Sequence, residues 1–210
     1  MYLFSRLATL RGNERRSIAW AVEMTNYVNA HSDHTVTLWR ADFGYPVGTV
    51  AWSTWVDSLA ALNEGFARLA DDDGYHDLVD AAEDLLPEPP HDLLRRAVFG
   101  EPGSAPPPPG AVTSVTTAVV ANGQYAEATA WGIEMAELVQ QITSQPTMFL
   151  VDAYGTFGQV TWLTGAPDMA TAGAGNGAVQ ADPDYIKRLF DVGDLFVPAS
   201  GQQRLVSRVA

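Results

Sequence analysis

The chain has no cysteine and only four histidines, and both shortages exclude classes of site. Without cysteine there is no disulfide, no thiolate nucleophile and no cysteine-ligated zinc or iron–sulfur centre. The histidines fall in no metal-ligand spacing such as H-E-x-x-H, whose two imidazoles share one helix face. We therefore expect no bound metal and no resident cofactor.

Basic residues are also scarce, since 12 Lys and Arg stand against 25 Asp and Glu, for a net charge of −13. Affinity for nucleic acid depends on Lys and Arg, so we expect no nucleic-acid partner, and an anionic membrane surface is disfavoured for the same reason. No apolar run approaches the roughly 20 residues that span a bilayer, and the N-terminus lacks a signal-peptide pattern. These observations predict a cytoplasmic protein.

A short phrase occurs twice in the chain. Ala19–Met24 reads AWAVEM and Ala130–Met135 reads AWGIEM, which places Trp20 and Trp131 111 positions apart. The same shift aligns an apolar stripe at helical spacing in both segments, even where residue identity is not kept. Because packing constrains pattern more than identity, the sequence predicts an internal duplication.

The expected elements follow the same order before and after a proline-rich segment, EPGSAPPPPG at Glu101–Gly110. The order is β-α-β-β-α-β, which is typical of ferredoxin-like units. In the first copy the second helical region is interrupted at Asp71–Gly74. The expected elements are a strand at Leu3–Leu10, a helix from Asn13 to Ser32, a hairpin of Thr35–Phe43 and Thr49–Trp55, helices from Asp57 and from Tyr75 to Leu86, and a strand at Leu93–Phe99; then strands at Ser114–Val120, Thr147–Tyr154 and Arg204–Val209 with a helix at Tyr125–Ile142.

We therefore predict an α+β fold of two tandem ferredoxin-like repeats, at residues 1–100 and 113–210, joined by a linker at residues 101–112. A single repeat leaves one sheet face and its edges uncovered. Two repeats can close their sheets into an intramolecular barrel with the helices outside. The prediction is a monomer that closes its own barrel, or a homo-oligomer.

The phrase QADPDYI at Gln180–Ile186 resembles the A-D-P-[DE]-aromatic phrase in the second helix of dimeric α+β barrel proteins. The first half has a degenerate version, DDDGYHD, at Asp71–Asp77. The superfamily includes NIPSNAP-like proteins, antibiotic-biosynthesis monooxygenases, polyketide cyclases, EthD-like proteins and haem-binding chlorite dismutase-like proteins. The resemblance implies a barrel and an apolar ligand cavity between sheet and helices, but one fold carries many chemistries.

Ligand-binding candidates come from matched tryptophans and from positions where the halves differ. Tryptophans recur at matched positions (Trp20 with Trp131, Trp52 with Trp162), where they either fill the core or line a cavity. With the shift above, the first half has Arg6, Trp39, Arg40, Tyr45 and Trp55 where the second has Thr117, Leu150, Val151, no equivalent and Gly165. We predict a hydrophobic small molecule as ligand, and the predicted ligand-binding residues are Arg6, Trp20, Trp39, Tyr45 and Trp52.

The catalytic candidates are Glu23, Arg40 and His34. Glu23 flanks the apolar stripe, where it is either an acid–base group or a boundary carboxylate. Arg40 lies on an expected strand and either meets an anionic or carbonyl group or points to solvent. His34 begins a strand without a visible orienting partner. His76, in the second helical region, is a candidate haem ligand by the resemblance alone.

A run of glycines at Gly173–Gly177 lacks the strand–loop–helix context of a phosphate-binding fingerprint, so we expect it inside a helix. Three functions remain open. The first is a metal-free oxygenase, cyclase or isomerase acting on a hydrophobic or aromatic substrate in secondary metabolism. The second is a non-catalytic ligand-binding or assembly protein of NIPSNAP type, and the third is a haem protein.

Overall fold

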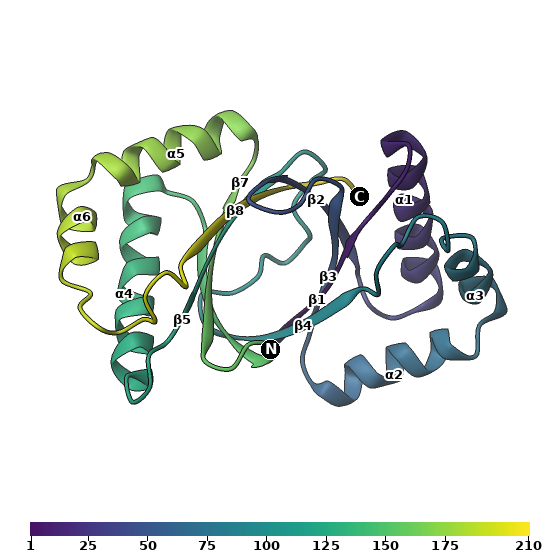
Figure 1. Ribbon diagram of the computed structural model, residues 1–210, viewed down its shortest axis with the longest axis horizontal. Coiled ribbons are helices and arrows are strands. Elements are labelled where there is room, and N and C mark those ends of the chain that lie inside the picture. Colours follow the sequence, from purple (N-terminus) through teal and green to yellow (C-terminus); the bar gives the residue numbers. More distant parts are fainter.

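Eight strands close into one barrel, and six helices lie outside it (Figure 1). The structure is a computed structural model that describes residues 1–210. The first seven elements are β1 (Tyr2–Thr9), α1 (Glu14–His31), β2 (Thr37–Phe43), β3 (Thr49–Val56), α2 (Leu59–Ala70), α3 (Asp73–Asp80) and β4 (His91–Phe99). The others are β5 (Val112–Val119), α4 (Tyr125–Thr143), β6 (Thr147–Tyr154), β7 (Gln159–Ala166), α5 (Met169–Ala181), α6 (Pro183–Phe190) and β8 (Gln202–Arg208).

The strand order around the barrel is β1-β3-β2-β8-β5-β7-β6-β4, and every neighbouring pair is antiparallel. The predicted hairpin of β2 and β3 is confirmed. Each half of the chain contributes four adjacent strands, in the orders β4-β1-β3-β2 and β8-β5-β7-β6. The two halves meet at two seams, β2 against β8 and β4 against β6.

Because all neighbours are antiparallel, β1, β2, β5 and β6 run in one direction and the other four strands run in the opposite one. The β2–β3 and β6–β7 turns therefore lie at the same end of the barrel, which we name the hairpin end. The segment between β4 and β5 lies at the opposite end, which we name the linker end. In the view along the barrel axis, this segment passes across the bore (Figure 1).

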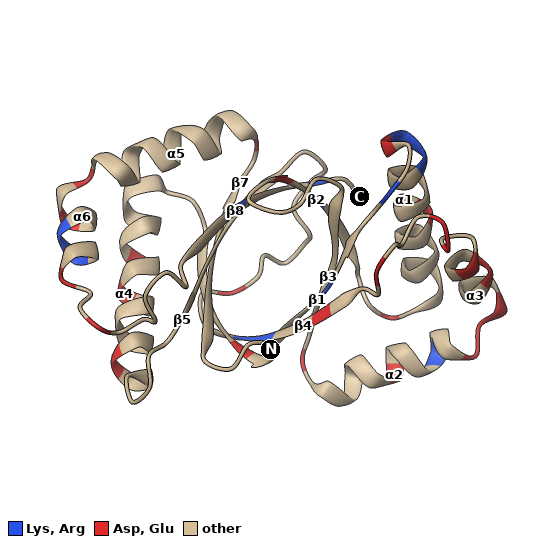
Figure 2. Cartoon of the chain, viewed as in Figure 1, with Lys and Arg blue, Asp and Glu red and all other residues tan.

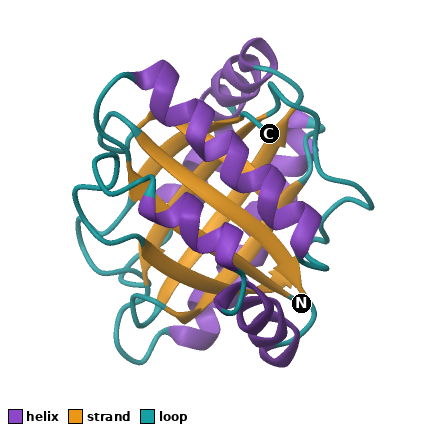
Figure 3. Cartoon of the chain, turned by 90° about the vertical axis from the view of Figure 1, so that its right-hand side faces the viewer, coloured by secondary structure: helices purple, strands orange, loops and turns teal.

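Helices α1, α2 and α3 cover the first half of the barrel and α4, α5 and α6 cover the second (Figures 1 and 3). The expected helix start at Asn13 is confirmed, since its side chain accepts a hydrogen bond from the Arg16 N–H. The expected interruption after α2 is also present. The helix resumes at Asp73, before the expected Tyr75, and ends at Asp80 rather than at Leu86. None of the helices has the length and apolar character that crossing a membrane requires.

The ADPDY phrase now has a structural explanation. Asp182 precedes α6 and accepts a hydrogen bond from the Tyr185 N–H at 2.9 Å, and Pro183 occupies the first helical position, where its missing N–H costs nothing. Asp72 caps α3 in the same way and bonds the Tyr75 N–H at 2.9 Å. The phrase marks the kink between two helices in each half, so it reports fold rather than chemistry.

The matched tryptophans pack edge-to-face between helix and sheet in both halves. The ring centroids of Trp20 and Trp52 are 5.8 Å apart, and those of Trp131 and Trp162 are 6.0 Å apart. Trp20 donates its indole N–H to the Leu78 carbonyl at 2.9 Å, and Trp162 donates to the Gly132 carbonyl at 2.8 Å. Packed rings therefore hold both layers, and each layer contains an indole N–H that donates to a backbone carbonyl.

The comparison between halves needs one correction in the first strand. Arg6 pairs with Trp52 in the sheet, and the residue that pairs with Trp162 is Thr116, not Thr117. The first strands are thus related by a shift of 110, and the helices by 111, because the turn after β5 holds one extra residue. A slip of one residue changes the face on which a side chain lies. Arg6 and Thr117 therefore lie on opposite faces of the barrel wall.

The glycine run lies inside α5, as predicted. A Cβ on Gly175 would lie 2.6 Å from Gln145 Nε2, so close packing explains this glycine. A Cβ on Gly173 or Gly177 would meet nothing within 4 Å, so packing does not explain these two.

Candidate functional site

The side chains that face the barrel interior divide into an apolar part and a polar part. Strand alternation places Leu3 and Leu150 on the inner face, opposite to the helix-facing Phe4 and Phe149. Toward the linker end the interior is apolar. It contains Leu3, Met148 and Leu150, with Trp55, Ala97 and Leu163 packed against them.

A set of polar side chains faces the interior toward the hairpin end. Asp152 follows the apolar run of β6 and Gln159 begins β7, so both lie beside the β6–β7 turn. Arg95 of β4 faces them across the seam. We name these three, together with Thr117, Arg204 and Tyr45, the polar ring; its members come from β4, β6, β7, β5, β8 and the β2–β3 turn.

Arg95 and Asp152 form a buried ion pair. Arg95 Nε lies 3.3 Å from Asp152 Oδ1, and the two side chains are 7% and 1% exposed. The geometry is incomplete, because neither Arg95 Nε nor Asp152 Oδ1 makes a hydrogen bond. The other carboxylate oxygen, Oδ2, accepts from Gln159 Nε2 at 3.0 Å. A buried charge without its hydrogen bonds is expensive, which makes this pair exceptional in the structure.

Burial alters the acidity of both partners. Removal from water raises the pKa of the Asp152 carboxyl above its ordinary value, although Arg95 and Gln159 oppose the shift. Burial likewise lowers the pKa of the Arg95 guanidinium, although Asp152 and Tyr45 oppose this. Both directions mean that the interior solvates charge poorly.

The remaining members complete the polar ring. Arg204 donates from Nη1 to Thr117 Oγ1 at 3.2 Å, and its guanidinium carbon lies 4.7 Å from the centre of the Tyr45 ring. This distance is a cation–π contact. Tyr45 and Arg204 are both close enough to Arg95 to influence its pKa, so the ring is electrostatically connected. Thr161 Oγ1, also on an inward-facing residue, is buried without a hydrogen-bond partner.

The strands of the barrel carry a large share of the basic residues of an acidic protein. Six of the 12 basic residues lie on strands, against three of the 25 acidic residues. Figure 2 shows the acidic residues mostly on the surrounding helices and loops, while the barrel strands carry arginine. Negative charge is therefore placed outside and positive charge along the wall.

Sequence reasoning missed Arg95, Asp152 and Arg204. A usable signal was present, since Asp152 follows the run TMFLV and a charge at the end of an apolar strand needs a partner. The partner, however, lies on the strand across the β4–β6 seam, and only the closed barrel brings the two together.

Of the predicted ligand-binding residues, Tyr45 joins the polar ring and Trp39 faces the interior on β2, where its indole N–H donates to Thr37 Oγ1 at 2.9 Å. Trp20 and Trp52 lie in the packed helix–sheet layer, and the Trp52 indole donates to Thr25 Oγ1 at 3.1 Å. Arg6 also lies on the helix side. Its guanidinium forms two hydrogen bonds of 2.8 Å with Asp92.

The predicted catalytic residues lie apart from one another and outside the polar ring. Glu23 is exposed on α1. Arg40 is exposed and lies 3.3 Å from Asp42 and 3.6 Å from Glu14. His34 Nε2 lies 3.1 Å from the Ala61 carbonyl, and at the matching place Gln145 Nε2 donates to the Thr171 carbonyl at 3.0 Å. Because glutamine serves equally well there, bracing of the helix explains His34.

The residues present do not fit a haem. His76 is exposed on α3, and its Nε2 lies 2.8 Å from the Ala70 carbonyl rather than facing a cavity. The space between α1, α3 and the sheet is occupied by Trp20, Trp52 and their neighbours. No group of three His, Asp or Glu side chains is arranged to hold a metal ion.

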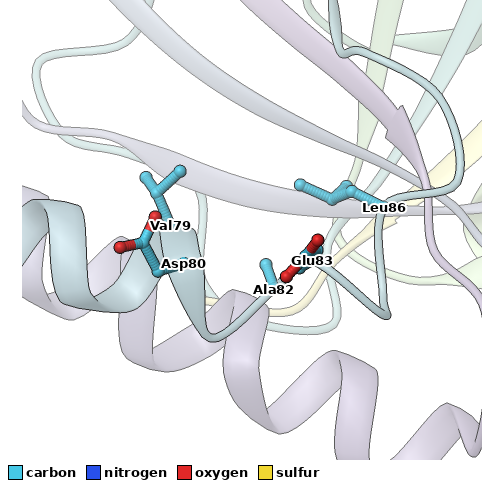
Figure 4. A pocket seen from close by; sticks show the side chains of 5 residues that line it. All are labelled: Val79, Asp80, Ala82, Glu83 and Leu86. Carbon is cyan, nitrogen blue, oxygen red and sulfur yellow. The ribbon is translucent and has the colours of Figure 1, made fainter.

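Two surface hollows are open depressions over α1 and α3. The larger, of about 590 Å³, is lined by Val79, Asp80, Ala82, Glu83 and Leu86 (Figure 4). Its only charged groups are carboxylates. The smaller, of about 420 Å³, contains Arg40 and Glu14. Neither hollow combines an enclosed apolar wall with convergent polar groups, which a small-molecule site needs.

Comparisons with known proteins identify the fold. No protein-family model matches the chain, and no curated protein matches it significantly in sequence. A protein of Fusobacterium nucleatum, suggested to be a monooxygenase, superposes with a TM-score of 0.73 at 8% identity, over 100% of this chain and 92% of that one. An anthrone oxidase-like protein superposes with a TM-score of 0.68 at 12% identity, over 100% and 91%.

A mutant chlorite dismutase from Candidatus Nitrospira defluvii is less similar, with a TM-score of 0.51 at 11% identity, over 98% of this chain and 91% of that one. These similarities extend over nearly the whole chain in each case, and all lie at identities that establish fold alone. The closed barrel with helices outside, recognised from the ADPDY phrase, is the fold of the dimeric α+β barrel proteins.

Proposed function

We propose that the chain is a metal-free oxygenase, cyclase or isomerase that acts on a hydrophobic or aromatic small molecule at the polar ring. The observation that carries the proposal is the buried Arg95–Asp152 pair, whose Nε and Oδ1 lack hydrogen-bond partners. Buried charged groups with shifted pKa values are more frequent at functional sites than elsewhere. The oxygenase-related names of two proteins of similar fold agree with the proposal.

The barrel in this proposal consists of two ferredoxin-like repeats. Equal strand orders in the two halves support this, as do matched tryptophan pairs and matched aspartate caps at Asp72 and Asp182. The polar ring is not repeated. The positions that match Arg95 and Asp152 are Val206 and Ala41, which pair at the other seam. The chain therefore has one such site.

Within the site, Asp152 is the proton acceptor. Its raised pKa brings a carboxylate closer to the range in which it can exchange a proton with a carbon or phenol acid. Arg204 and Tyr45, on the other side of the ring, stabilise the negative charge that develops on a substrate oxygen. Loss of that proton gives an electron-rich carbanion or phenolate, the species from which isomerisation, cyclisation or reaction with oxygen begins.

The experiment is a turnover screen with aromatic ketones and phenols, monitored by absorbance and by oxygen uptake. We expect Asp152→Asn to lower kcat by about 10²–10⁴-fold, the usual contribution of a general base. Glu23→Gln, an exposed carboxylate on α1, should leave kcat unchanged. Equal loss in both variants, or full activity in Asp152→Asn, would contradict the proposed role.

A non-catalytic ligand-binding or assembly protein of NIPSNAP type is the second candidate. The observation in its favour is that tryptophan pairs occupy both helix–sheet layers, where the resemblance implied a ligand cavity. The two candidates are separated by recovering a bound compound after incubation. A compound that stays bound and chemically unchanged supports this second function.

A further inference from the structure

We infer that the polar ring binds a monoanionic, planar small molecule, with the negative group at Arg95 and Arg204. The inference deepens the proposed function, because it concerns the same site, but it is a statement about equilibrium binding and not about turnover. It rests on the hydrogen bonds that the ring leaves open, on its charge balance and on the surfaces around it.

The guanidinium of Arg95 has N–H donors that no acceptor in the protein uses. Arg95 is 6% exposed, its Nε has no acceptor, and none of the side-chain hydrogen bonds in the barrel uses its guanidinium. A guanidinium carries five N–H donors in a flat fork that matches a carboxylate or a similar oxyanion. Asp152 lies close enough to hold the charge but does not take the Nε hydrogen. The fork is thus positioned without being used.

Charge balance gives the sign of the ligand. The ring contains two guanidinium groups, Arg95 and Arg204, and one carboxylate, Asp152. One positive charge is left without a partner in an interior that solvates charge poorly. A monoanion neutralises the ring, whereas a neutral ligand leaves the excess and a dianion reverses it. The overall charge of −13 cannot attract such a ligand, so recognition must be local.

The side chains around the polar ring favour a ligand whose remaining part is flat and apolar. Arg204 already has the Tyr45 ring 4.7 Å from its guanidinium carbon, so a planar group is accepted there. Both turns at the hairpin end carry exposed apolar side chains, which in a monomer often mark a ligand entrance. These are Phe43 at the end of β2 with Val47 on the turn that follows it, and Tyr154 at the end of β6 with Phe157 on the turn that follows it, with exposures from 66% to 97%.

The test compares 2-naphthoate with 2-naphthamide, which differ in charge but hardly in shape, by isothermal titration calorimetry of the whole chain. We expect 2-naphthoate to bind at least tenfold more tightly. Arg204→Gln should weaken 2-naphthoate at least tenfold and leave 2-naphthamide unchanged. Asp152→Asn should strengthen 2-naphthoate severalfold, because it removes the competing carboxylate; a purely structural pair predicts no such gain.

Arg96→Gln is the matched control, because Arg96 follows Arg95 on β4 but is exposed on the opposite face. It should not change the affinity for either compound. Arg95→Met alone would leave the buried Asp152 carboxylate without its partner. The double variant Arg95→Met/Asp152→Leu is therefore used in place of that single variant, and it should abolish the preference for 2-naphthoate.

Equal affinities for the two compounds, no binding of 2-naphthoate at millimolar concentration, or equal losses in Arg204→Gln and Arg96→Gln would each overturn the inference. Selective binding of 2-naphthoate without any turnover of the phenols and ketones would support it while contradicting the proposed enzyme function. Turnover of the phenols or ketones, together with equal affinities for 2-naphthoate and 2-naphthamide, would support the proposed enzyme function while contradicting the inference.

Discussion

Arg95 Nε lies 3.3 Å from Asp152 Oδ1 across the β4–β6 seam, yet neither atom has a hydrogen-bond partner. A pair of this kind gains less than one with aligned hydrogen bonds, while both groups still lose their hydration. The seam therefore contains a contact that is poor for stability, whereas the matching place of the other seam holds the apolar pair Ala41 and Val206.

The first prediction concerns the stability of this pair. Asp152→Leu and Arg95→Met should each destabilise the fold by about 3–5 kcal/mol, because each leaves one buried charge unpaired. The double variant Arg95→Met/Asp152→Leu should be within about 1 kcal/mol of the wild type or more stable, since apolar replacements of buried pairs often are. Urea unfolding of all four proteins measures the cycle; additive losses in the double variant would contradict it.

The second prediction concerns pH. Burial raises the pKa of Asp152 in the folded protein, so the folded state keeps this proton at pH values where the unfolded chain, with an ordinary aspartate pKa of about 3.9, has lost it. The favourable contribution is complete below the unfolded value and is lost as pH rises through the folded value.

The free energy of unfolding of the wild type relative to Asp152→Asn should therefore rise between pH 7 and pH 4. Urea unfolding at several pH values measures it, with Glu23→Gln as the exposed control. A difference that stays constant, or that falls toward pH 4, would show that the carboxylate is stabilised in its charged form.

The third prediction uses the glycines of α5. Gly173→Ala should stabilise the protein by about 0.5–1 kcal/mol, because a Cβ there meets nothing within 4 Å and alanine restricts the unfolded chain. Gly175→Ala should destabilise it by about 1–3 kcal/mol, because the Cβ would lie 2.6 Å from Gln145 Nε2. Thermal melts of the two variants should shift in opposite directions.

The fourth prediction tests the tryptophan layers. Trp20→Ala and Trp131→Ala should each lower the free energy of unfolding by about 3–5 kcal/mol, as large-to-small changes in a packed core do. Phe157→Ala, at a side chain that is 97% exposed, should change it by about 0.5 kcal/mol or less. A melt of Trp20→Ala or Trp131→Ala that moves by under a degree would mean that the ring is not part of a packed layer.

The sequence predicted the fold well because its signals were local. The hairpin of β2 and β3, the Asn13 cap and the break between α2 and α3 are each determined by residues within a few positions of one another. The barrel itself followed from the repeated order of elements. The one error in comparing the halves, Thr117 for Arg6, arose because a constant shift cannot detect a single extra residue in a turn.

The candidate site was largely invisible for the opposite reason. Arg95, Asp152 and Arg204 lie on three different strands, and two of them meet only at a seam between the halves. Comparison of the two halves did single out Tyr45, which the structure places beside Arg204, because the second turn is shorter and has no equivalent residue. Differences between the two halves could be read from the sequence, while contacts between the halves required the structure.

The two seams of the barrel have a consequence for how such a protein can change. In a barrel made by two identical subunits, a substitution at one seam appears at the other by symmetry. Here one chain supplies both seams, so Arg95 and Asp152 occupy one while Val206 and Ala41 occupy the other. Because the two seams have different sequences, a buried charged pair at the β4–β6 seam does not have to occur a second time, and the matching place of the β2–β8 seam keeps an apolar pair.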